Sequence, residues 1–102
     1  MLPVSTIIQA TKTVASAGTP EKLAPDGTYC DVVLLEAKNA RGTNNTGTVW
    51  IGNSATNDAQ LLALAAGTSL QFSAPPGKTL DLGIFYIDVA TAGDGVTYTA
   101  LN

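Results

Sequence analysis

Short runs rich in β-branched and aromatic residues recur along the whole chain, and Gly, Pro, Asn or Asp separates them about every eight to twelve residues. Two segments alternate between apolar and polar positions: 70–73 reads Leu-Gln-Phe-Ser, and 96–100 reads Val-Thr-Tyr-Thr-Ala. This period of two is typical of a strand with one buried face. No segment shows a long helical period, so the pattern predicts a chain made mainly of strands.

Other segments are typical of strands by composition, namely 4–15, 22–24, 29–38, 48–52 and 84–89. The segment 29–38 is the strongest, because the middle of it, 32–35, is apolar at successive positions. That pattern favours a central strand covered on both faces. Just before it, Pro25 presets the backbone and Gly27 permits a positive φ, which predicts a turn.

The segment 57–66 carries conflicting local signals. As a helix, it would have Asn57 as the N-cap, Gln60 at the third position, a leucine-rich stripe and Gly67 after its end. Against this, two turns of helix are unstable alone, and the surrounding segments are all extended. Both alternatives, helix and extended chain, stay open at this point.

These elements predict an all-β protein with a single domain over 1–102. We expect a compact antiparallel β-sandwich of about seven or eight strands, with jelly-roll or immunoglobulin-like connections. Residues 1–10 could form an extended N-terminal arm, and they lack the basic and apolar regions of a cleaved signal. The longest apolar run, 61–66, is too short to cross a membrane.

The chain has unusually few charged residues for a globular protein. Charged residues make up 13% of the chain, against roughly 25% in typical domains, while mean hydropathy is +0.20. Fourteen threonines, with serine, asparagine and glycine, take the place of long charged side chains. Ordering these short side chains costs little conformational entropy. We therefore expect much of the surface to be covered by copies of this chain or by another protein.

Several classes of function are disfavoured. The chain has no histidine, which removes histidine-based catalysis and most zinc sites. Asp88 and Asp94 are the best candidates for a calcium site, but a turn role for these carboxylates is favoured, and we predict no metal, no cofactor and no enzyme activity. The five basic residues are scattered, which argues against nucleic-acid binding. The lone Cys30 is expected to be a buried apolar residue.

The aromatic residues Trp50, Tyr86 and Tyr98 could form a binding platform, although a domain this small needs large side chains in its core. Trp50 is the best surface candidate because it lies between two asparagine-rich loops. The candidate contact residues for a glycan or a partner protein are therefore Trp50, Asn44, Asn45 and Asn53. Whether Trp50 lies in the core or at the rim is left open.

Four motifs in this order resemble small virion proteins of tailed bacteriophages. They are Asn-Thr-Gly-Thr-Val-Trp-Ile-Gly at 45–52, Leu-Ala-Ala-Gly-Thr-Ser-Leu at 64–70, Phe-Tyr-Ile-Asp at 85–88 and Ala-Thr-Ala-Gly-Asp-Gly-Val at 90–96. The likeness covers about residues 28–99.

The resemblance is strongest to a capsid cement, or decoration, protein. It implies a small β-sandwich, a homotrimer, that is assembled into the virion in the host cytoplasm. The protein would bind the outside of the head and stabilise the shell by bridging major capsid protein subunits. The alternative is a tail or head-fibre module that recognises host-surface glycans with Trp50 and the asparagine-rich loops.

Overall fold

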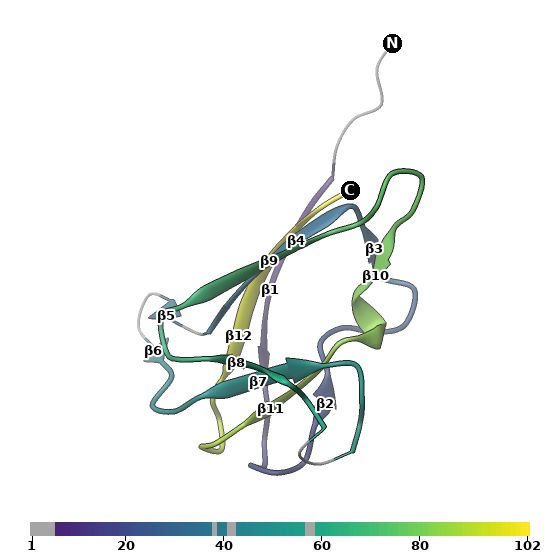
Figure 1. The fold of residues 1–102 in the computed structure, drawn as a ribbon. Helices are drawn as coiled ribbons and strands as arrows, with labels where there is room; N and C mark the ends of the chain where they lie inside the picture. The colour runs from purple at the N-terminus through teal and green to yellow at the C-terminus, as the bar shows by residue number, and fades with distance from the viewer. Residues whose placement is uncertain (1–5, 38, 41–42, 57–58) are drawn as a thin grey trace.

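The structure is a computed structural model that describes residues 6–37, 39–40, 43–56 and 59–102. The first of two four-stranded sheets contains, in spatial order, β1 (Ile7–Thr13), β12 (Gly95–Leu101), β4 (Val32–Ala37) and β9 (Ser69–Ser73). The second contains β2 (Glu21–Lys22), β11 (Tyr86–Val89), β7 (Val49–Gly52) and β8 (Leu62–Leu64). All pairings are antiparallel (Figure 1).

Two small pairs and one helical turn complete the described structure. The pairs are β3 (Tyr29–Cys30) with β10 (Leu80–Asp81), and β5 (Asn39–Ala40) with β6 (Thr43–Asn44). The 3-10 turn η1 (Leu82–Ile84) is capped by the side chain of Asp81. The predicted all-β antiparallel sandwich is therefore confirmed, with eight strands in its two main sheets.

The strand order is that of a jelly roll. Along the eight main strands, the chain crosses from one sheet to the other at every connection except β7 to β8. The first and last strands lie side by side, with Ile7 opposite Leu101 and Thr13 opposite Gly95 (Figure 1). In an immunoglobulin fold the first strand pairs with the second instead, so the structure decides between the two predicted connections.

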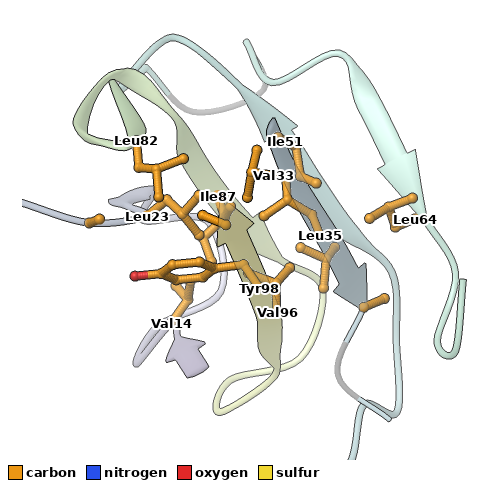
Figure 2. Packing of buried hydrophobic residues seen from close by; sticks show 14 of the residues in the cluster. Val14, Leu23, Val33, Leu35, Ile51, Leu64, Leu82, Ile87, Val96 and Tyr98 are labelled. Carbon is orange, nitrogen blue, oxygen red and sulfur yellow. The ribbon is translucent and has the colours of Figure 1, made fainter. Parts of the chain in front are cut away.

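The core lies between the two sheets and follows the alternation along each strand. From the first sheet, β4 and β12 contribute inward-facing residues, and from the second sheet β7 and β11 do so (Figure 2). The fully covered members include Val33, Leu35, Val96, Ala100, Val49, Ile51 and Ile87. Burial of each large apolar side chain contributes about 1.5–3 kcal/mol, so this layer is the main source of stability.

The strongest predicted strand, 29–38, is central but is covered on one face only. Val33 and Leu35 are fully buried, whereas Leu34 is 44% exposed on the outer face of the sheet. The prediction of two covered faces is therefore wrong within this chain. Antiparallel sandwiches leave their outer faces open, and an apolar run does not reveal whether solvent or a partner lies beyond it. Lys38, the last residue of the prediction, lies outside the described residues.

The ambiguous segment is extended where the structure describes it. Leu62–Leu64 form β8 and pair with β7, and the Gln60 side chain donates to the carbonyl oxygens of Ser54 (2.5 Å) and Thr56 (2.9 Å). The pairing with β7 and these local Gln60 bonds replace the helix that local propensity allowed. Residues 57–58 lie outside the described part, and with them the proposed cap at position 57.

The predicted N-terminal arm falls partly on β1. Residues 7–10 pair with β12 as part of the first sheet, whereas residues 1–5 lie outside the described residues. An arm therefore stays a prediction for the first residues alone. Gly27 has φ of 83°, which agrees with the turn predicted after Pro25.

Candidate functional site

The two candidate calcium ligands bind backbone N–H groups of distant loops. Oδ2 of Asp94 accepts from the N–H groups of Thr46 (3.1 Å) and Gly47 (2.9 Å). Oδ1 of Asp88 accepts from Gly18 (2.9 Å) and from the adjacent residue Val89 (2.8 Å). A cation needs oxygen ligands, and N–H donors aimed at these oxygens supply the opposite charge, so the geometry is that of loop closure. Among the described residues, no three acidic or cysteine side chains cluster as metal ligands do.

The candidate contact residues do not form one patch. Asn45 is buried, and its amide bonds both the N–H and the carbonyl group of Gly95. Asn53 is exposed directly after β7. Asn44 lies in β6 opposite Asn39, and its side chain is outside the described part of the structure.

The three aromatic residues divide between core and surface. Tyr98 is buried among the core residues, and this burial raises the pKa of its hydroxyl (Figure 2). Trp50 is half-buried on the outer face of the second sheet, where it stands between Asp88 and Ala63 in the ladder. Tyr86 is also half-buried on that face, opposite Lys22. Trp50 is therefore accessible at the surface and does not fill the core.

The outer face of the first sheet carries little charge. Strand registers place its side chains in three rows across β1, β12, β4 and β9: Ile7, Leu101, Val32, Ser73; then Gln9, Thr99, Leu34, Gln71; then Thr11, Thr97, Glu36, Ser69. We call these twelve residues the low-charge face, because Glu36 is their only charged member. Its apolar corner is open to solvent, with Ile7 63% exposed and Leu34 and Leu101 similarly accessible.

The low-charge face is also shallowly hollowed. One depression of about 350 Å³ is lined by Val32, Leu34, Gln71, Thr99 and Leu101. A second, of about 440 Å³, extends over β12 toward Gln9 and Thr11. In the middle row, the short side chain of Thr99 lies between the longer side chains of Gln9 and Leu34. The low-charge face therefore has surface hollows into which side chains of a partner can fit.

An apolar groove opens where β8 and β9 flank the sandwich. It has a volume of about 250 Å³, and Ile51, Leu61, Leu62, Phe72, Ile84 and Phe85 supply most of its lining. The rings of Phe72 and Phe85 lie 5.1 Å apart within this wall. Because β8 has only three residues, the core at this edge is incompletely covered. Leu61 is 86% exposed at the groove, and Ile84 and Leu62 are also accessible.

Sequence reasoning missed this groove, although one signal for it was present. The pair Leu61 and Leu62 belongs to the segment for which helix and extended chain both stay open from the sequence, and a helix would place both in one apolar stripe. In an extended chain, successive side chains point to opposite faces, so adjacent leucines cannot both enter one core.

Cys30 behaves as expected from its apolar surroundings. Its side chain is fully buried, and burial raises the pKa of its thiol, with a smaller effect from the charge of Asp31. A thiol with a raised pKa is a poor nucleophile at neutral pH.

No helix within the described residues has the length and apolarity needed to span a membrane. Comparison of the chain with protein-family models, with curated proteins and with solved structures finds no match.

Proposed function

We propose that this chain is a capsid decoration protein of a tailed phage, which binds the outside of the head and bridges major capsid protein subunits. The observation that carries the proposal is the low-charge face with its exposed apolar corner. The resemblance of the four sequence motifs supplies the phage context and implies a homotrimer. The fold is consistent with a protein that acts by binding to other protein subunits.

The distribution of exposed apolar residues supports an interface role. Six of the seven large hydrophobic residues that are exposed in the described structure fall in two places: Ile7, Leu34 and Leu101 on the low-charge face, and Leu61, Leu62 and Ile84 at the groove. Gathered apolar exposure of this kind marks surfaces that bind other proteins. The threonine, serine and glutamine residues between them carry no charge that must be neutralised in a contact.

Residues of two of the four motifs bond each other in this fold. Asn45, Thr46 and Gly47, from the first motif, bond Gly95 and Asp94 of the last motif through four contacts of 2.7–3.1 Å. The motifs therefore join the loop before β7 to the start of β12.

The test is to locate the chain in virions of the phage whose genome encodes it. We expect electron microscopy to find it on the outer surface of the head, between major capsid subunits. The variant carrying Leu34→Lys and Leu101→Lys would lower head occupancy at least tenfold, because it buries two charges in the contact. Ala55→Lys, at an exposed loop position outside the low-charge face, is the matched control and would keep full occupancy.

Virions without the chain, or full occupancy of the lysine variant, would overturn the decoration role. Circular dichroism of each purified variant checks that the fold is retained, as expected for exposed positions.

A fibre module that binds glycans is the second candidate, because Trp50 is accessible on the outer face of the second sheet. It predicts that the chain lies on a tail or head fibre, that glycans quench the fluorescence of Trp50, and that Trp50→Ala abolishes the binding. A glycan array without any signal would remove this candidate.

A further inference from the structure

The strand β1 is a free edge of the first sheet and presents an ordered row of backbone groups. Thr6 and Asn102 bond each other twice, with N···O distances of 3.0 and 2.9 Å. Since bonded and non-bonded pairs alternate in an antiparallel ladder, the even-numbered residues of β1 bond β12. The N–H and C=O groups of Ile7, Gln9, Thr11 and Thr13 therefore point away from the sheet. In the described part of the chain, β1 pairs with no strand except β12.

This edge lacks the features that normally prevent strand pairing. β1 contains no proline, and its one charged residue, Lys12, is held by Glu21 of β2 with an Nζ–Oε1 distance of 2.9 Å. The other edge strands of the two main sheets are shorter: β9 has five residues, β8 has three and β2 has two, against seven in β1. Proteins usually protect long edge strands with proline, charge or a bulge.

We propose that β1 pairs with β1 of a second copy of this chain, antiparallel and around a two-fold axis at Ala10. In this register Ile7 lies opposite Thr13 of the second copy, and Gln9 lies opposite Thr11. All four outward residues of each chain then enter the ladder, which forms about eight backbone hydrogen bonds. The two first sheets become one continuous sheet of eight strands.

The side chains in this register suit a second copy. Lys12 stands opposite Ile8 of the other chain, so no two like charges face each other across the pairing. Polar side chains meet polar ones at Gln9 and Thr11, and neither chain leaves an outward backbone group unpaired. An isologous contact of this kind closes on itself, which stops further growth at the edge.

The contact is independent of the proposed capsid role and differs from a three-fold contact. It predicts that the native mass of the purified chain is an even multiple of the chain mass: a dimer, or a hexamer if trimers also form. Sedimentation or native mass spectrometry measures this mass. A monomer or a trimer at the highest accessible concentration would overturn the proposal.

Thr11→Pro tests the edge itself. It removes one outward N–H group, which the fold does not use, and proline is tolerated at such edge positions. We expect the dissociation constant of the β1–β1 contact to rise at least tenfold and the native mass to fall by half. Gln71→Pro is the matched control, because the bond from Ala74 to Asp31 places the N–H of Gln71 on the opposite free edge of the same sheet. An unchanged mass in Thr11→Pro, or a mass halved by Gln71→Pro, would contradict the assignment.

Cysteine crosslinking tests the register without relying on a proline variant. Ala10→Cys would place two thiols across a non-bonded pair with a Cα separation of about 4.5 Å, which suits a disulfide. Thr13→Cys would place them about 20 Å apart. With oxidised glutathione we expect a crosslinked dimer for Ala10→Cys only. The parent chain serves as control, since Cys30 is fully buried. Equal crosslinking of both variants, or none, would exclude this register.

Discussion

The side-chain amide of Asn45 donates a hydrogen bond to the carbonyl oxygen of Gly95 at 2.7 Å and accepts one from its N–H group at 3.0 Å. Strand β4 ends at Ala37, opposite Val96, so the ladder beside Gly95 has no strand residue of β4. The amide has one donor and one acceptor, as a backbone residue has. Asn45 therefore continues the ladder by one position and ties the loop before β7 to β12.

Asn45→Ala is expected to lower the free energy of unfolding by about 2–4 kcal/mol, because it leaves a buried N–H and a buried carbonyl group without partners. Asn45→Asp would also destabilise, since a carboxylate accepts from Gly95 but cannot donate to its carbonyl oxygen. Denaturant unfolding measures both. Asn53→Ala, at an exposed position, is the control and should change stability by less than about 0.5 kcal/mol. Equal effects at the two positions would refute this role.

Asp94→Ala removes the acceptor for two loop N–H groups and is expected to cost about 1–3 kcal/mol. Asp94→Asn keeps an acceptor oxygen of similar shape, so its loss should be clearly smaller. The comparison by chemical denaturation separates the hydrogen bonds from the volume of the side chain. A loss in Asp94→Asn as large as that in Asp94→Ala would argue that these hydrogen bonds do not stabilise the loop.

Gly95→Ala should be among the most destabilising single changes, with a loss above about 3 kcal/mol. A methyl group there would overlap the carbonyl oxygen of Lys12 and lie 2.7 Å from Cα of Thr13, both on backbone that cannot move aside. Gly77→Ala is the matched control. Gly77 has φ of 75° with no atom near the added carbon, so it should cost about 1 kcal/mol of backbone strain. Thermal unfolding of the two variants measures both losses. Steric overlap at position 95 predicts that Gly95→Ala loses more stability than Gly77→Ala.

The Lys12–Glu21 pair predicts a pH dependence. The hydrogen bond from Lys12 lowers the pKa of Glu21, and the N–H of Ala15 lowers it further. A lowered folded-state pKa means that this stabilisation is complete above the unfolded pKa and is lost as the pH falls through the folded value. Glu21→Gln should therefore reduce stability at pH 7 by about 0.2–1 kcal/mol and flatten the decline below the unfolded pKa. Titration of stability in both proteins provides the measurement, and parallel curves would exclude the pair as a cause.

Cys30 should react with thiol reagents only after the chain opens. Its side chain is fully buried and its thiol pKa is raised, so both access and thiolate content are reduced. We expect native labelling at least about a hundredfold slower than labelling in denaturant. Fast labelling of the native chain at neutral pH would show that the covering layer opens readily.

Local sequence patterns predicted correctly those features that depend on one segment alone, such as which side chains of a strand face the core and where a turn lies. Leu70 and Phe72 do face inward from β9, and Gly27 does adopt a positive φ. The same reasoning failed for Leu34, because an apolar residue on a strand does not say which layer covers it. It could not predict the partners of Asn45 and Asp94, although the sequence favours a turn role for Asp94. Their partners lie 47–50 residues away, and no local signal indicates such pairs.

The sequence by itself determined a chain made mainly of strands, because two segments have the period of two that is typical of a strand with one buried face and no segment has a long helical period. It also determined a surface with few charges. The tertiary structure alone decided the jelly-roll order, the extended form of Leu62–Leu64 and the location of the exposed apolar residues. These depend on contacts between residues far apart in the chain, whose energies outweigh the small preferences of single segments.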